Sequence, residues 1–221
     1  MSARPVLVTG FAPYGGRGRN PAADIAHALD GCTIAEVPVV GRLLPVALDE
    51  IIAKAESLLD ELQPRIVINV GLWPGESMVR IERVGLNLAD FEIPDNHGRK
   101  ARDESLSRNG PAAKFATLPV RKIEEAMLAA GIPSRISNSA GSFLCNACLY
   151  SFLSAAEKKK GTRCGFIHVP YLPEQVADLL HELKKEARLE THQRADFASM
   201  DLATGTRAVA IALETAVREP L

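Results

Sequence analysis

The stretch Ile66-Val67-Ile68-Asn69-Val70-Gly71 decides the fold class of this chain. It is a short run of mostly β-branched apolar residues that ends at a glycine, which is the pattern of a buried β-strand. Two other runs share this pattern. Residues 6–9 read Val-Leu-Val-Thr and end at Gly10, and residues 165–169 read Gly-Phe-Ile-His-Val and are followed by Pro170. The sequence thus predicts several strands buried inside a sheet.

Segments with apolar residues at helical spacing separate these strands. In residues 48–62 leucine, isoleucine and alanine recur at intervals of three or four positions, and Pro64 follows the segment. Asn20 before Pro21 is typical of a helix N-cap followed by proline at the first helical position. The sequence predicts helices over residues 22–29, 48–62, 120–130, 143–156, 173–185 and 201–217, further strands over residues 33–39, 82–91 and 136–138, and loops over residues 10–20 and 94–109.

The alternation of strands and helices predicts an α/β fold in which helices cover a mostly parallel sheet. The chain has 221 residues, of which 47% are hydrophobic and 24% are charged, and this is an ordinary globular balance. No linker-like segment interrupts the pattern. We therefore expect a single domain over residues 1–221.

Charge and hydropathy exclude several function classes. The formal net charge is −1 and no basic face is indicated, so nucleic acid is not an expected partner. No stretch approaches the roughly 18 apolar residues that span a bilayer, and the N-terminus does not read as a signal segment. We therefore expect a cytoplasmic protein with no membrane partner, in which all the cysteines are free thiols: Cys32, Cys145, Cys148 and Cys164.

Cys145 is the first candidate for chemistry. It follows a short predicted strand and a turn of small residues, Ser139-Ala140-Gly141-Ser142, and it lies in the first turn of a predicted helix. Free backbone N–H groups and the positive end of the helix dipole favour a thiolate there, and the thiolate is the nucleophile. The same N–H groups are suited to bind an oxyanion. The alternative is a cysteine packed in the core as a small apolar residue.

His168 is the candidate base. It lies near the C-terminal end of the predicted strand 165–169, and catalytic groups of α/β proteins gather outside the carboxyl ends of strands. A histidine in an apolar run is also a common core residue, but a cysteine at a helix start strengthens the catalytic interpretation. Nothing local marks Glu82 as catalytic. On its own it is interpreted as a surface carboxylate paired with Arg83.

Three other kinds of site find less support. Cys145 and Cys148 have Cys-x-x-Cys spacing, which leaves a redox function as an alternative. The glycine-rich loop 9–16 lacks the Gly-x-Gly-x-x-Gly and Gly-Lys-Ser/Thr patterns, so its aromatic residues suit an apolar pocket wall better than a phosphate site. The remaining histidines lack a ligand spacing such as His-x-x-x-His, so no metal site is expected; they are His27, His97, His181 and His192.

A set of segments in fixed order, from Val6 to about Gln175, carries a family resemblance. They are Val6-Leu-Val-Thr-Gly-Phe-Ala-Pro-Tyr-Gly-Gly16, Asn20-Pro21, Glu82-Arg83-Val84, Asn87-Leu88, Ile93-Pro94-Asp95-Asn96, Gly110-Pro111-Ala112-Ala113, Ser137-Asn-Ser-Ala-Gly-Ser-Phe-Leu-Cys-Asn146 and Gly165-Phe-Ile-His-Val-Pro-Tyr-Leu-Pro-Glu-Gln175. In sequence and in order they resemble the pyroglutamyl peptidase I family, also called the pyrrolidone-carboxylate peptidases.

The resemblance implies a three-layer α/β/α fold and a cysteine exopeptidase that removes an N-terminal pyroglutamyl residue from peptides without a cofactor. It assigns the nucleophile, base and orienting roles to Cys145, His168 and Glu82. It also implies peptides with a blocked N-terminus as substrates, and a homo-oligomer, since the family often forms tetramers. The implied pocket residues, among which the backbone around Gly71 and Ile93 would hold the lactam, are Phe11, Tyr14, Gly71, Leu72, Glu92, Ile93 and Phe143.

The sequence departs from the family pattern near the expected pocket. Leu72 and Glu92 stand where the family usually has glutamine and arginine. Glu76 replaces another family arginine, Arg80 occurs where none is usual, and Tyr14 replaces a phenylalanine. An altered N-terminal specificity and a non-catalytic module that binds a lactam or a peptide therefore stay open as alternatives.

Overall fold

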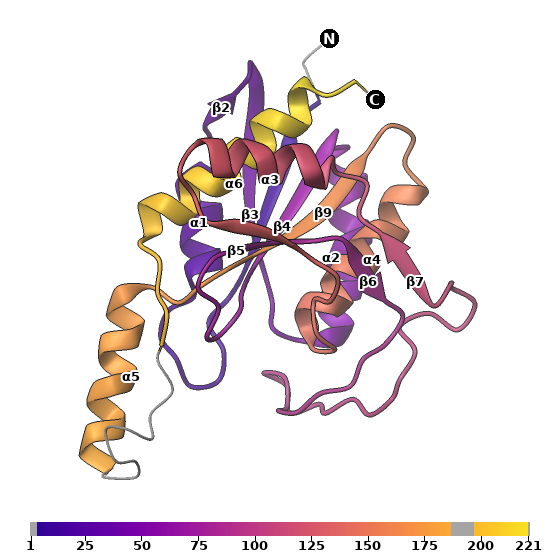
Figure 1. Cartoon of the computed structure of the whole chain (residues 1–221). Helices are drawn as coiled ribbons and strands as arrows, with labels where there is room; N and C mark the ends of the chain where they lie inside the picture. The colour runs from indigo at the N-terminus through magenta and orange to yellow at the C-terminus, as the bar shows by residue number, and fades with distance from the viewer. Residues whose placement is uncertain (1–3, 187–196, 221) are drawn as a thin grey trace.

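One seven-stranded sheet organises the described residues, 4–186 and 197–220, of the computed structural model (Figure 1). Its strand order is β2-β3-β1-β4-β9-β5-β8. All neighbours are parallel except the pairs β2–β3 and β5–β9. The strands are β1 (Val6–Phe11), β2 (Thr33–Ile34), β3 (Val37–Leu44), β4 (Ile66–Leu72), β5 (Val79–Glu82), β8 (Ser134–Ser137) and β9 (Arg163–Val169).

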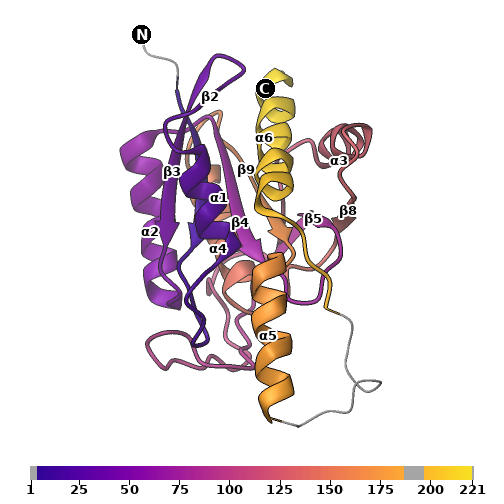
Figure 2. The ribbon, with the colours of Figure 1, turned by 90° about the vertical axis from the view of Figure 1, so that its left-hand side faces the viewer.

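Helices cover both faces of this sheet, which confirms the predicted three-layer α/β/α fold (Figures 1 and 2). One face packs against three helices, α1 (Pro21–Leu29), α3 (Val120–Ala129) and α6 (Leu202–Arg218). The other face packs against α2 (Leu48–Leu62) and α4 (Leu144–Glu157). Figure 2 shows α5 (Pro173–Glu186) projecting past the ends of the strands. None of the helices in residues 4–186 and 197–220 is long and apolar enough to cross a membrane.

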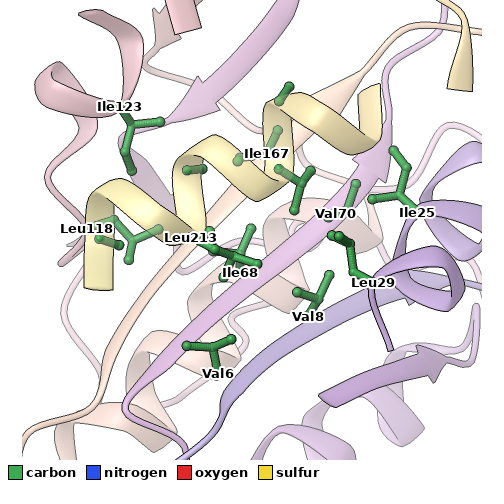
Figure 3. Packing of buried hydrophobic residues seen from close by; sticks show 14 of the residues in the cluster. Val6, Val8, Ile25, Leu29, Ile68, Val70, Leu118, Ile123, Ile167 and Leu213 are labelled. Atoms are coloured by element: carbon green, nitrogen blue, oxygen red, sulfur yellow. The ribbon is translucent and has the colours of Figure 1, made fainter. Parts of the chain in front are cut away.

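Alternating side chains of the central strands form two separate cores. Val6 and Val8 of β1, with Ile68 and Val70 of β4, belong to the core under α1 and α6, which Figure 3 shows from close by. Leu7 and Val67 instead belong to the core under α2 and α4. This is the period-2 alternation of a strand buried on both faces. The mostly apolar character of the runs therefore reflects two covered faces rather than one.

Asn69 interrupts the apolar run of β4 and is fully buried. Its side chain accepts a hydrogen bond from Thr9 Oγ1 at 2.7 Å and donates one to the Gly165 carbonyl at 3.2 Å. A buried amide without partners would cost roughly 1–3 kcal/mol, and these bonds remove that cost. They also tie together β1, β4 and β9, which are the strands whose carboxyl ends point toward the candidate site.

The sequence-based helices agree with the structure to within two residues at each end, and Asn20 caps α1 by accepting from the Ala22 N–H at 3.1 Å. The prediction of one continuous strand at 33–39 is wrong. The segment forms a hairpin in which Ala35 and Glu36, both with positive φ, form the turn between β2 and β3, and β3 continues to Leu44.

The strand predicted at 82–91 is also wrong. β5 begins earlier, at Val79, and leaves the main sheet after Glu82. The chain then changes partners, because the Arg83 carbonyl accepts from the Ala116 N–H at 2.8 Å. Beyond it β6 (Val84–Leu86) pairs with β7 (Ala113–Phe115) in a separate two-stranded sheet. Residues 94–109 contain no helix or strand of the described structure, as predicted.

Candidate active site

Cys145 lies in the first turn of α4, as the sequence predicts. The chain reaches it from β8 through the small-residue turn 138–143. Asn146, the next residue and fully buried, fixes the start of this helix. Its amide donates to the carbonyls of Leu86 at 3.0 Å and Leu88 at 2.8 Å, and its oxygen accepts from the Leu86 N–H at 2.8 Å. These three bonds hold the helix start, and with it the thiol, against the β6 segment.

The start of α4 also offers backbone donors. Phe143 is the N-cap residue and its apolar side chain forms no capping hydrogen bond. The first intrahelical bond runs from the Ala147 N–H to the Phe143 carbonyl at 3.2 Å. The N–H groups of the preceding positions 144–146 therefore lie before the first i→i−4 bond of the helix, where donors have no intrahelical acceptor. Such groups are suited to hold the negative oxygen of a tetrahedral intermediate.

His168 and Glu82 form a buried pair across two antiparallel strands. His168 is on β9 and Glu82 ends β5, and both are fully buried. The distance from His168 Nδ1 to Glu82 Oε1 is 2.8 Å. Because a carboxylate accepts, Nδ1 carries the proton, and this leaves Nε2 as the basic nitrogen. Nε2 has no hydrogen-bond partner among the described residues.

The His168 ring is held by aromatic neighbours. Trp73 meets it edge-on at a centroid distance of 5.0 Å, and Phe166 lies tilted against it at 4.7 Å. Aromatic pairs prefer such geometries. Together with the bond to Glu82, they fix the direction in which Nε2 points. Cys145 and His168 line the same cavity.

The protonation states of the two groups follow mainly from burial. Burial, assisted by the negative charge of Glu82, raises the pKa of the Cys145 thiol to about 12. Burial also lowers the pKa of His168, although the hydrogen bond and charge of Glu82 act in the opposite direction. The helix N-terminus alone favours a thiolate, so burial outweighs it here. The resting site therefore holds a neutral thiol and a neutral imidazole.

Arg80 is the second partner of Glu82. Its Nε donates to Glu82 Oε1 at 3.1 Å, the same oxygen that faces His168. Its Nη2 donates to Ser137 Oγ at 2.6 Å and to the Ser139 carbonyl at 2.7 Å. The interpretation of Glu82 as a surface carboxylate paired with Arg83 is therefore wrong. The two-residue spacing places Arg80, not Arg83, on the same strand face as Glu82.

Two more charges continue this arrangement. Glu76 Oε2 lies 3.5 Å from Arg80 Nη1 and 2.6 Å from Arg135 Nη2. Burial alone would raise the pKa of Glu76, but the hydrogen bonds from Arg135 and the Ser77 N–H, with the charges of Arg135 and Arg80, lower it on balance. These side chains form a series of contacts in which positive and negative charges alternate, and the series ends at His168: Arg135, Glu76, Arg80 and Glu82.

A cavity of about 350 Å³ opens in front of Cys145 and His168. This volume is within the usual range for small-molecule sites. Of the seven pocket residues implied by the resemblance, six line the cavity: Phe11, Tyr14, Leu72, Glu92, Ile93 and Phe143. Gly71 is not among the lining residues. It lies close to the thiol, because a Cβ at this position would be 3.0 Å from Cys145 Sγ.

The cavity wall is mostly apolar, and its charged groups are acidic. Phe143 and Tyr14 both line the cavity, with ring centroids 6.4 Å apart, and Phe143 packs against the buried Phe91 ring at a centroid distance of 4.7 Å. Asp90 and Glu92 are the carboxylates that line it, and no lysine or arginine of the described chain does so. Arg80 does not line the cavity. The sequence alone did not show whether the Arg80 side chain reaches the cavity; in the structure it points toward Glu82.

Several lining residues were not predicted. Trp73 has two contacts, the edge of His168 and the Arg80 guanidinium, whose carbon is 3.8 Å from the ring centroid. Ser142 lines the cavity and donates from its hydroxyl to the Asp90 carbonyl at 2.6 Å. The only signal in the sequence was position, since Trp73 directly follows a buried strand at its carboxyl end.

The other cysteines do not join the site. Cys148 and Cys164 are fully buried in the core under α2 and α4, and burial raises the pKa of both thiols. Cys32 is exposed, and all four cysteines are free. The glycine-rich loop places Phe11 and Tyr14 in the cavity wall. Among the remaining histidines, His97 pairs with Glu50 at 3.1 Å on the surface, and His192 lies outside the described residues.

A parallel α/β sheet that brings a cysteine at a helix start and a histidine bonded to a buried glutamate to one cavity defines a thiol hydrolase. Comparison with known proteins gives the family. A family model described as pyroglutamyl peptidase matches residues 4–219, and the chain belongs to this family.

Relatives and solved structures agree with this assignment. The chain is 48% identical to the pyrrolidone-carboxylate peptidase of Pyrococcus furiosus over 174 residues, which cover 78% of this chain and 84% of the relative. It is 40% identical to that of Thermococcus litoralis over 207 residues, which cover 90% and 94%. A crystal structure of pyrrolidone carboxyl peptidase from Pyrococcus furiosus superposes with a TM-score of 0.90 at 42% identity, covering 98% of this chain and 100% of that one.

Proposed function

We propose that this chain is a cysteine exopeptidase that removes an N-terminal pyroglutamyl residue from peptides, with Cys145 as nucleophile, His168 as base and Glu82 as the residue that orients the histidine. The observation that carries the proposal is the buried Glu82–His168 pair: His168 Nε2 has no hydrogen-bond partner among the described residues, and His168 and Cys145 line the same cavity. Family membership supplies the substrate class.

The first step is attack on the carbonyl of the pyroglutamyl residue. His168 Nε2 takes the Cys145 proton while sulfur bonds to the carbonyl carbon, and the carbonyl oxygen becomes negative. The backbone N–H groups at the start of α4 donate to this oxygen. Because burial raises the pKa of the thiol, Cys145 needs His168 to accept its proton. Glu82 stabilises the imidazolium that forms.

The second step releases the shortened peptide. The tetrahedral intermediate collapses, the carbon–nitrogen bond breaks, and the leaving amine takes the proton from His168 Nε2. The pyroglutamyl group remains on Cys145 as a thioester. Water then attacks the thioester with His168 again as the base, which releases pyroglutamate and restores the thiol. No step needs a cofactor or a metal.

The cavity suits the lactam ring. The methylenes need apolar walls, which Phe11, Leu72 and Phe143 provide. The lactam N–H and C=O need hydrogen-bond partners, because a buried amide without them costs roughly 1–3 kcal/mol. Ile93 lines the cavity yet is 46% exposed, so this residue lies where the cavity meets solvent. Gly71 is not among the lining residues, and it lies against the thiol of Cys145.

Leu72 and Glu92 bear on specificity, because both line the cavity. A leucine cannot donate or accept, and a carboxylate opposes negative charge that develops on the substrate. We therefore infer that this chain cleaves pyroglutamyl peptides less efficiently than a chain with the family's glutamine and arginine at these positions would. Alternatively, its specificity has shifted toward a related blocked N-terminus.

The proposal also covers the domain organisation, cellular location and oligomeric state of the enzyme. A single domain is supported by one sheet that draws its strands from Val6 to Val169. A cytoplasmic location is supported by four free cysteines, one of them exposed. A homo-oligomer, a tetramer on the family resemblance, is supported by exposed apolar side chains such as Phe115 at 69% and Leu43 at 57%. Light scattering on the purified chain measures the mass of the assembly.

A panel of fluorogenic amides tests the function. The acyl groups are pyroglutamyl, N-acetyl-alanyl, prolyl and free alanyl, and each is measured with the wild type and with Cys145→Ala. We expect hydrolysis of the pyroglutamyl amide by the wild type alone. Binding of the pyroglutamyl amide without turnover would instead support the non-catalytic alternative, and turnover confined to another acyl group would support altered specificity.

A further inference from the structure

Arg80 is a buried cation next to the proposed catalytic pair, and the reaction described above gives it no role. It is 8% exposed, and its guanidinium has acidic partners on two sides, Glu82 at 3.1 Å and Glu76 at 3.5 Å. Its remaining donors bind Ser137 and Ser139, and the Trp73 ring covers one of its faces. A guanidinium held on so many sides has one orientation, because its planar fork of donors is rigid.

We propose that Arg80 is a positioning residue that fixes Glu82 in the orientation that holds His168 and keeps the imidazole in its neutral, proton-accepting form. This inference rests on the proposed function, since it concerns how the same base is prepared.

The positioning argument follows from a shared oxygen. Glu82 Oε1 faces His168 Nδ1 at 2.8 Å and accepts from Arg80 Nε at 3.1 Å, while Oε2 has no hydrogen-bond partner among the described residues. Arg80 is therefore the side chain that stops the carboxylate from rotating. It is anchored in turn to the segment after β8 that leads to Cys145, through Ser137 and the Ser139 carbonyl. The positions of base and nucleophile are thus linked.

The charge argument follows from the groups that face His168. From β5 these are Glu82 and Arg80, from the β4–β5 connection Glu76, and from α4 Cys145. Arg135 on β8 acts on them through Glu76. The four charges of this series sum to zero, so a neutral imidazole leaves the buried site uncharged and an imidazolium adds one unpaired positive charge. Arg80 disfavours the imidazolium both directly and by neutralising Glu82.

Three substitutions separate positioning from simple stability. Arg80→Met removes the charge and the donors, Arg80→Lys keeps the charge but loses the fork, and Arg83→Met is the matched control one residue beyond Glu82. The readouts are the pH profile of kcat/KM on a pyroglutamyl amide and the titration of His168 followed by NMR of ¹³C-labelled histidine. The NMR readout does not depend on activity, so it stays informative if the wild type fails on pyroglutamyl substrates.

For Arg80→Met we expect kcat to fall about 10- to 100-fold with KM little changed, because loss of a partner that orients a histidine has effects of this size. The acid limb of the profile and the His168 titration should both move up by roughly 0.5 to 1 pH unit. Arg80→Lys should keep the wild-type titration with an intermediate kcat, and Arg83→Met should match the wild type. The proposal is overturned if Arg80→Lys has full activity and Arg80→Met leaves the His168 titration unmoved, or if Arg83→Met reproduces the Arg80→Met effects.

Discussion

Gly71 and Cys145 are in such close contact that residue 71 has no room for a side chain. A Cβ there would lie 3.0 Å from Cys145 Sγ and 2.7 Å from the Phe166 ring. Gly71 also pairs in register with His168 across β4 and β9. The absence of a side chain at residue 71 thus leaves the space that the Cys145 thiol, carried by α4, occupies.

Gly71→Ala is expected to lower kcat/KM at least about 100-fold, because the added methyl group must displace the sulfur or the Phe166 ring, and misplacement by about 1 Å has effects of this size. Overpacking should also lower the free energy of unfolding by about 1–3 kcal/mol. Gly18→Ala is the control, since a Cβ there meets nothing within 4 Å. Steady-state kinetics and urea unfolding check both variants, and wild-type activity in Gly71→Ala would show that the contact is dispensable.

A comparison of Cys145→Ser with Cys148→Ala distinguishes the peptidase interpretation, which needs only Cys145, from the redox interpretation, which needs both cysteines. Serine is harder to deprotonate than cysteine, so Cys145→Ser should lose more than about 1000-fold in kcat with an unchanged fold. Cys148 is fully buried in the core. Its replacement by alanine should lower stability by about 1 kcal/mol and leave kcat within about twofold. Turnover assays and thermal unfolding measure these effects. Equal loss of turnover in the two variants would favour a dithiol mechanism.

Comparing Glu82→Gln with His168→Ala tests whether loss of the base lowers activity more than loss of the carboxylate that orients it. A glutamine oxygen still accepts from Nδ1, so Glu82→Gln should slow the reaction much less than His168→Ala, which has no base. Glu82 raises the pKa of both His168 and Cys145. Removing its charge should therefore move the acid limb of kcat/KM to lower pH, opposite to Arg80→Met. Full activity in His168→Ala would rule out the proposed triad.

The layered fold could be predicted from the sequence because its strongest signals are local. The apolar runs at residues 6–9, 66–70 and 165–169 each lie in a strand covered on both faces, where no polar alternation is required. The placement of Cys145 at a helix start and of His168 near a strand end could be predicted for the same reason. A helix start and a strand end are properties of a few neighbouring residues, and both kinds of position gather chemistry in α/β sheets.

The surroundings of Glu82 could not be predicted in this way. β5 has only four residues and lies between β9 and β8, antiparallel to the first and parallel to the second. No periodicity in four residues shows such an insertion, so the burial of Glu82 and its pairing with Arg80 depend on contacts that are distant in sequence. Only the family resemblance pointed to Glu82. Trp73, Ser137 and Ser139 were missed for the same reason.

Tyr14→Phe tests a hydroxyl in the cavity wall. Burial first, and then the neighbouring Cys145, raise the pKa of Tyr14 to about 12, so the group stays a protonated donor over the working pH range. Two other polar side chains of the wall are already engaged, since Asn20 caps α1 and the Ser142 hydroxyl donates to the Asp90 carbonyl. Tyr14→Phe should raise KM roughly 5- to 10-fold with little change in kcat. Tyr171→Phe, away from the cavity lining, should leave both constants unchanged. Wild-type kinetics in Tyr14→Phe would exclude a bond from this hydroxyl to substrate.

Leu72 and Glu92 set the polarity and charge of the cavity in which the oxyanion forms. The double change Leu72→Gln with Glu92→Arg adds a hydrogen-bonding amide and reverses a charge that opposes the transition state. We expect it to raise kcat/KM on a neutral pyroglutamyl amide by roughly tenfold. The gain should shrink as salt is added, because Glu92 is exposed and screening shortens the reach of its charge.

Glu125→Arg makes the same charge change on the exposed surface of α3, on the opposite face of the sheet from α4, and should leave kcat/KM unchanged. If it raises activity as much as the double change, the effect comes from net charge and not from the cavity. If the double variant instead loses activity while the wild type already cleaves pyroglutamyl peptides efficiently, Leu72 and Glu92 belong to a working lactam site. The departures from the family pattern would then be compensated within the cavity wall, because Arg80 faces Glu82 and cannot supply the missing cation.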